Sequence, residues 1–198
     1  MDIDQLTLLA KVVGLSSAGI FAGYTWALSR ATVPSILDYG SGDEKVILAQ
    51  WRHQYIDGAA FSRPCCLLNA LSFGFLAYHA TISTLNLSIP VRYLYIFAAL
   101  ATASGVPWAL TLLRRTNGAL SIRSKRLVGA YEGNGSWGQP MCITYASHEK
   151  AAIEREAKDA RFRDTKELVG RWRWHNDLRT ALLILGTVVG AVAVAVDK

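Results

Sequence analysis

Four long apolar blocks constrain what this chain can fold into. Residues 6–29, 64–86 and 90–113 are each long enough to cross roughly 30 Å of hydrocarbon as a helix. The fourth span, residues 176–196, has a polar entry turn and an apolar run over residues 180–196, which is at the short end of the roughly 17–25 residues that a spanning helix needs. Hydrophobic residues make up 52% of the 198 residues, and the mean hydropathy is positive. These lengths predict an all-α integral membrane protein, with residues 1–198 forming one four-helix transmembrane bundle.

The distribution of charge predicts the orientation of the four spans. All but three of the 21 Lys and Arg residues fall in the loops 30–63 and 114–175 or at their edges, and the exceptions are Lys11, Arg92 and Lys198. By the positive-inside rule, both loops are expected to be cytosolic and both termini lumenal or external. The net charge of +6 is accounted for by this topology and by anionic lipid, so we expect the bilayer, and no nucleic acid, as a partner. The expected membrane is the endoplasmic reticulum, the default for a eukaryotic chain without other signals.

Proline and glycine signals divide the chain between these spans. Pro34 is expected to stop the first helix, and residues 39–42 to form a turn. Residues 43–61 have an amphipathic helical pattern. Pro107 predicts a kink in the third span, because a proline ring removes a backbone hydrogen bond there.

The second loop is expected to contain a loop segment and a further helix. Residues 117–138 are basic and rich in glycine, which predicts a mobile segment that rests on anionic headgroups. Ser147 is a favourable N-cap for the charged segment that follows, up to residue 166. This segment predicts an additional cytosolic amphipathic helix in the 3–4 loop.

Two ionisable side chains fall inside predicted spans, where they are costly unless paired or hydrated. Lys11 is close enough to one end of its span for its ammonium group to reach the membrane surface. His79 is either a neutral histidine bonded to a helix carbonyl or to Asn86, or a functional group. Three cysteines without a C-x-x-C spacing form no disulfide framework, and Cys65 and Cys66 are expected to pack as small apolar residues.

A polar cluster opens the last apolar block. Trp172, Asn176 and Arg179 are spaced i, i+4, i+7, so they share one helix face, and His175 lies beside them. Interfacial anchoring alone explains tryptophan and arginine at a cytosolic helix end. It explains an aligned asparagine and arginine less well, since both face inward only where a polar group is present. We therefore favour a functional site here.

A second cluster precedes the second span. Trp51, His53 and Tyr55 lie within five residues of one another. Their simplest interpretation is an aromatic belt at the membrane interface. The functional alternative is that they cover the mouth of a cavity on the cytosolic side.

Motifs for several enzyme classes are absent. There is no glycine-rich phosphate loop, no kinase or metalloprotease signature and no nucleophile elbow. None of the four histidines are paired at metal-ligand spacing, so we predict no metal site, although His53 and His175 could converge through tertiary folding.

These residues resemble a known membrane family. Four spans, Pro34 after a first helix of small residues, Trp51-x-x-x-Tyr55 before the second span and Trp172-x-x-x-Asn176-x-x-Arg179 are similar to the DUF1772 family, and within it to the fungal anthrone oxygenases. The resemblance covers most of the chain. It implies oxidation of an anthrone to the anthraquinone by O2 in secondary-metabolite biosynthesis, without flavin or haem.

On this resemblance, each candidate residue acquires an expected role. His175 would be the base that removes the acidic C–H proton, with His53 or His79 as alternatives. Asn176 and Arg179 would stabilise the enolate oxygen. The substrate ring would stack on one of three aromatic residues, Trp172, Trp51 or Tyr55.

Two rival interpretations remain. The chain can be a non-catalytic membrane scaffold or assembly protein that docks a partner on residues 147–166. It can also be an oxygenase with a metal held by histidines of different helices. For either enzyme we expect a small hydrophobic aromatic substrate, O2 as co-substrate and a possible homo-oligomer.

Overall fold

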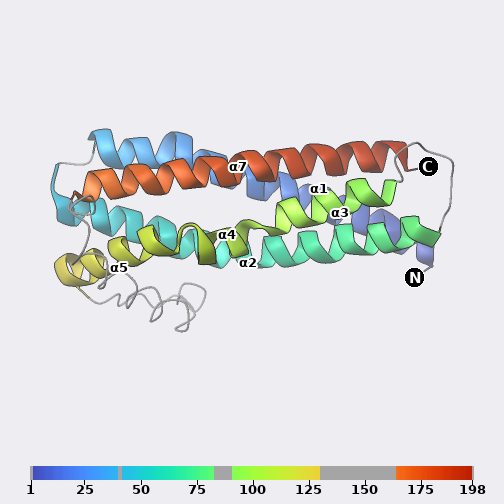
Figure 1. Cartoon of the computed structure of the whole chain (residues 1–198), viewed down its shortest axis with the longest axis horizontal. Coiled ribbons are helices and arrows are strands. Elements are labelled where there is room, and N and C mark those ends of the chain that lie inside the picture. Colours follow the sequence, from blue (N-terminus) through green and yellow to red (C-terminus); the bar gives the residue numbers. More distant parts are fainter. Residues whose placement is uncertain (1, 40–41, 83–90, 130–163, 198) are drawn as a thin grey trace. The chain divides into compact units, whose positions relative to one another are not determined.

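Almost all of the described residues are helical, and none of them forms a strand. A computed structural model describes residues 2–39, 42–82, 91–129 and 164–197 (Figure 1). This confirms the predicted all-α class for the part of the chain that is described. The elements, in chain order, are α1 (Ile3–Ala27), the π-helical segments η1 (Leu28–Thr32) and η2 (Ser35–Tyr39), α2 (Glu44–Ile82), α3 (Val91–Ala103), α4 (Gly105–Thr111), α5 (Arg114–Val128) and α7 (Thr165–Val196).

Three helices are long and apolar enough to cross a membrane. They cover Ile3–Tyr39, Glu44–Ala80 and Thr165–Val196, and α3 with α4 makes a fourth span if the bent pair is counted as one. By length and composition, the chain is therefore a multi-pass membrane protein with three to four spans. The second of these helices begins well before residue 64, because the predicted amphipathic segment 43–61 continues through Pro64 into the span. A membrane-length helix tolerates such a proline where its neighbours satisfy the freed carbonyl.

The first helix does not stop at Pro34 as we predicted. Helical structure continues to Tyr39, and the turns on either side of the proline are π-helical. The Val33 N–H bonds to the carbonyl of Leu28, five residues earlier. A π turn is wider than an α turn, so it relieves the clash between the Pro34 ring and the preceding turn. The hydroxyl of Ser35 donates to the Ala31 carbonyl (2.8 Å), which gives this carbonyl a donor beside the proline.

The predicted kink in the third span is present, but it lies ahead of the proline. α3 and α4 are bent by 46° at a break after Ala103. The carbonyl of Ala103 is the one that the missing N–H of Pro107 would have bonded, four residues later. The Ser104 hydroxyl donates to the Ala101 carbonyl (2.7 Å) at the break.

The basic segment predicted as a loop from residue 117 is helical as far as Val128. Helix α5 buries every residue from Thr116 to Ser124. Burial along the segment outweighs the low helix propensity of its polar residues and of Gly118, which misled the sequence prediction. The Arg52 guanidinium donates to the Gly129 carbonyl just past the end of α5 (2.7 Å). Residues 147–163, which make up most of the predicted helix that begins at Ser147, lie outside the described residues.

The described residues divide into two compact units. Unit 1 comprises Met1–Tyr24, Ser62–Val106 and Arg179–Lys198, and unit 2 comprises Thr25–Phe61 and Pro107–Leu178. The core of unit 1 forms around Phe73 and Tyr95, whose rings stack with centroids 6.4 Å apart. Near the end of the chain, Asp197 accepts from the Tyr95 hydroxyl (2.9 Å) and pairs with Lys11 (3.0 Å). Lys11, predicted to reach the membrane surface, has this carboxylate as a partner.

Two glycines allow close helix packing inside unit 1. A Cβ added at Gly186 would lie 2.7 Å from the Ala101 Cβ, and one added at Gly190 would lie 2.8 Å from the Phe73 ring. Small residues at such positions let helices approach closely in a membrane.

We expect Gly186→Ala to lower the free energy of unfolding by about 1–3 kcal/mol, because the added methyl group overpacks a rigid contact. Gly74→Ala is the matched control, since its added Cβ meets nothing within 4 Å. It should be neutral or slightly stabilising through its higher helix propensity. Thermal denaturation of both variants in the same detergent tests this, and equal melting temperatures would contradict the packing argument.

Candidate functional site

The Trp172 side chain is a buried structural group of unit 2. It is 4% exposed, and its indole Nε1–H donates to the side-chain oxygen of Asn117 on α5 (3.0 Å). A buried indole needs such an acceptor, because an unsatisfied polar group is costly in an apolar interior. The predicted stacking surface is therefore buried and bonded to the helix that the sequence prediction had assigned to a loop.

Asn176 is fully buried in the same unit. Its side-chain Nδ2 donates to the Thr25 carbonyl (3.0 Å) and to the Ser29 hydroxyl (2.6 Å). An amide nitrogen carries two hydrogens, so these two bonds use its donor capacity. In this arrangement Asn176 binds the first helix rather than presenting its N–H groups to a substrate.

His175 lies beside these residues and is partly exposed. Its ring meets Trp174 edge to face, with centroids 5.0 Å apart at 76°. Its Nδ1 is buried and has no hydrogen-bond partner within the described part of the chain. A neutral imidazole nitrogen of this kind can accept a proton, provided that a substrate can reach it.

Arg179 belongs to unit 1. It is 8% exposed, and it lies close enough to Cys66 and Tyr24 to interact electrostatically with both. The Cys66 thiol is within 3.9 Å of the Thr102 carbonyl, which it approaches as a weak donor. A guanidinium group inside an apolar helix is costly, and such groups are functional candidates by default.

The aromatic residues Trp51 and Tyr55, in the first part of α2, stack on each other. Trp51 is 1% exposed, and its ring lies parallel to that of Tyr55 with centroids 5.1 Å apart. Both residues occupy the face of α2 that packs inward in unit 2. Neither is among the residues that line the cleft described next.

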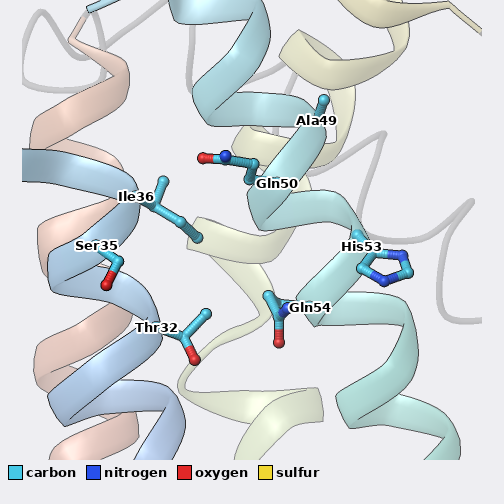
Figure 2. Close-up of a pocket in the computed structure, with 7 residues that line it drawn as sticks. All are labelled: Thr32, Ser35, Ile36, Ala49, Gln50, His53 and Gln54. Atoms are coloured by element: carbon cyan, nitrogen blue, oxygen red, sulfur yellow. The ribbon is translucent and has the colours of Figure 1, made fainter. Parts of the chain in front are cut away.

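A cleft of about 490 Å³ lies on the other face of this segment of α2, also within unit 2 (Figure 2). In Figure 2, the Gln50 amide extends toward Ile36, Gln54 lies between α2 and Thr32, and the His53 ring extends to the other side, away from Thr32, Ser35 and Ile36. The lining combines two amides, two hydroxyls and an imidazole with a small apolar wall. The lining residues are Thr32, Ser35 and Ile36 from the π-helical region and Ala49, Gln50, His53 and Gln54 from α2.

His53 has a carboxylate partner. Its Nε2 lies 3.2 Å from Asp57 Oδ2, one helical turn later, and the two side chains are 63% and 53% exposed. When Nε2–H donates to this carboxylate, the neutral ring keeps Nδ1 as a proton acceptor. His53 therefore borders the cleft and has a carboxylate within contact distance.

Comparison with known proteins identifies the family. The model of the anthrone oxygenase family matches residues 51–189. The chain belongs to the anthrone oxygenase family. No curated protein and no solved structure matches the chain. Membership confirms the family resemblance of the sequence and indicates an oxygenase role.

The residues matched by the anthrone oxygenase model include all five predicted catalytic side chains, and these five divide between the two units. His53, His175 and Asn176 lie in unit 2, and of these three His53 lines the cleft. Arg179 and His79 lie in unit 1, and His79 stacks on Phe75 with ring centroids 6.2 Å apart. Among the described residues, no group of three or more His, Cys, Asp or Glu side chains could hold a metal ion.

Sequence reasoning missed most of the cleft. Gln50 and Gln54 are spaced i, i+4 on the polar side of α2, opposite the stacked aromatic pair, and this pattern was visible in the sequence. Thr32 and Ser35 carried no comparable signal. They flank a proline that was expected to end the helix, so their joint position on a helical wall was not predictable.

We expect Trp172→Phe to lower the free energy of unfolding by about 1–3 kcal/mol, because it leaves the buried Asn117 oxygen without its donor. Trp174→Phe is the matched control, since Trp174 is 58% exposed. Denaturation of the purified variants measures the difference. A Trp172→Phe protein as stable as the control would show that this hydrogen bond does not support unit 2.

Proposed function

We propose that this protein is a membrane oxygenase that oxidises an anthrone-type aromatic polyketide to the anthraquinone with O2. Family membership supports the reaction class. The observation that carries the assignment of a site is His53, paired with Asp57 at the edge of a cleft of about 490 Å³.

The size and lining of the cleft suit a flat, oxygenated aromatic ring system. Small-molecule sites typically measure about 300–1,000 Å³ and combine an apolar wall with a few polar groups. Ile36 and Ala49 supply apolar contact, and Gln50 and Gln54 supply amide donors and acceptors. A planar apolar substrate also partitions into the bilayer, so it would approach the protein from the membrane.

Proton abstraction is the first step of the proposed reaction. The central CH2 of an anthrone is acidic because its conjugate base is an aromatic enolate, so a neutral imidazole is a competent base. His53 would take this proton on Nδ1, and Asp57 would orient the ring and stabilise the imidazolium. The Gln50 and Gln54 amides would donate to the enolate oxygen.

The enolate then reduces O2. One electron passes from the enolate to O2, and the resulting carbon radical and superoxide combine to form a C–O bond. The peroxide anion takes up the proton held by the imidazolium. The second C–H proton is then lost while the O–O bond breaks, which gives the quinone carbonyl and one molecule of water.

His175 and Arg179 are the rival catalytic residues. The His175 Nδ1, which has no hydrogen-bond partner among the described residues, would serve as the base, and the Arg179 guanidinium would stabilise the enolate, if the substrate binds to α7 instead of the cleft. We also propose that the cleft faces the cytosol at the endoplasmic reticulum, as the charge distribution predicts. The homo-oligomer stays a prediction from the sequence.

We expect His53→Ala to lower kcat for emodin anthrone by about 10²–10⁴-fold, the usual contribution of a general base. The measurement is quinone formation in membranes from a heterologous host, at matched protein levels. Empty-vector membranes are essential, because anthrones also oxidise spontaneously in air. Asp57→Asn should give a smaller loss, since it weakens the orientation of the base without removing it.

The same assay on His175→Ala, His79→Ala and Arg179→Gln separates the candidates. Full activity in His53→Ala together with loss in His175→Ala would refute the assignment of the cleft. Full activity in all four variants would refute a histidine base and enolate stabilisation by Arg179 alike.

Carbanion oxidation by O2 needs no metal or flavin, so we expect none to be required. Turnover should persist after treatment with EDTA and 1,10-phenanthroline. Elemental analysis and absorbance spectra of the purified protein should show neither a stoichiometric transition metal nor a flavin. Loss of activity on chelation, restored by one added metal, would favour the histidine-held metal instead.

A further inference from the structure

The first helix changes its hydrogen-bond register at the point where it reaches the cleft. α1 ends at Ala27, and η1 occupies Leu28–Thr32 in the π register, in which Val33 N–H bonds to the carbonyl five residues earlier. Thr32, the last residue of η1, and Ser35, the first residue of η2, line the cleft. The register of η1 therefore determines which side chains the helix directs to the cleft.

The side chain of Asn176 is bonded at this change of register. Its Nδ2 donates to the carbonyl of Thr25, in the last turn of α1, and to the hydroxyl of Ser29, inside η1. Asn176 is 0% exposed, and Thr25 and Ser29 are equally buried. One amide group therefore spans the α-to-π junction from a neighbouring helix within unit 2.

A second contact lies beside the first. Arg30 of η1 and Asp177, which follows Asn176, form an exposed ion pair at 3.7 Å. An exposed pair at this distance contributes little by itself. It does show that Asn176 and Asp177, which are successive on α7, contact Ser29 and Arg30, which are successive on η1.

We propose that Asn176 is a positioning residue that fixes the π register of η1 and thereby holds Thr32 and Ser35 in the wall of the cleft. The effect of Asn176 on turnover rests on the proposed function of the cleft. The effect of Asn176 on the position of Thr32 and Ser35 is independent of that function.

The geometry of helices explains why the register matters. An α turn has 3.6 residues, so shifting the register by one residue rotates everything beyond the shift by about 100°. Relaxation of η1 to the α register would turn Thr32 and Ser35 away from α2 by about this angle. Pro34 adds to the strain of an α register, because its ring clashes with the preceding turn there.

The test reads the position of the cleft wall directly. The full-length protein, with Cys65→Ala, Cys66→Ala and Cys142→Ser, receives Ser35→Cys as a reporter for labelling by a charged maleimide. Asn176→Leu keeps the branched side chain of four heavy atoms but removes both donors, and Leu178→Ala is the matched control on an exposed position of the same helix. The labelling rate and its protection by an anthraquinone product are measured for each.

We expect Asn176→Leu to change the labelling rate several-fold and to abolish protection by the product, while Leu178→Ala leaves both unchanged. In the protein without the reporter, Asn176→Leu should raise KM about tenfold while kcat stays within about twofold, because the base and its carboxylate are untouched. Ser29→Ala should give a smaller change in the same direction. The double variant should be no worse than Asn176→Leu alone, since both act through one contact.

An unchanged labelling rate in Asn176→Leu would overturn the proposal. If this variant fails to accumulate, Ser29→Ala is measured in its place, and an unchanged rate there has the same consequence. A changed labelling rate without a change in KM supports the positioning role and counts against the cleft as the substrate site. A fall in kcat at unchanged KM would overturn the positioning role, because it would indicate that Asn176 acts on the reacting atoms.

Discussion

The hydrogen bonds of Asn176 to the first helix are the contact on which the arrangement of unit 2 depends. In a helix able to cross a membrane, a side-chain amide must find its acceptors inside the protein, because lipid offers none. Asn176 finds them in a backbone carbonyl and a hydroxyl of one neighbouring helix, which defines both the partner and the height at which the two helices meet. Such polar contacts specify one arrangement, whereas apolar contacts tolerate many.

The same principle explains how α5 is held. The Trp172 indole donates to Asn117 near the start of α5. Near the end of α5, Arg123 donates to the Thr165 hydroxyl (2.9 Å). Thr165 in turn bonds Glu44, so three helix ends meet through one buried guanidinium and one hydroxyl. These contacts involve polar residues whose sequence pattern resembles that of a loop. Their helical structure follows from tertiary partners far away in the sequence, and the propensity of the segment gives no warning of it.

The parts of the fold that depend on composition were predictable, and the parts that depend on specific partners were not. Long apolar blocks defined the membrane helices, and Pro107 predicted a bend that the structure places at Ala103. Pro34 misled because a proline can be accommodated by π turns as well as by a helix end, and the sequence does not distinguish the two. The shared face of Trp172 and Asn176 was predicted from spacing, but their acceptors lie at Asn117 and in the first helix, which no local pattern reveals.

One face of α2 is aromatic and the other is polar, and the polar face alone carries the groups that the proposed reaction requires. The aromatic face, with Trp51 and Tyr55, is occupied by internal stacking, and the polar face carries the cleft. Once the enolate forms, its own high-energy electrons reduce O2, so the protein needs to supply only a base, an orienting acid and a few donors. A single histidine at the edge of a polar cleft would suffice for this. The burial of Asn176 would then serve the shape of the cleft, because a base contributes only when the substrate is held within hydrogen-bond reach of it.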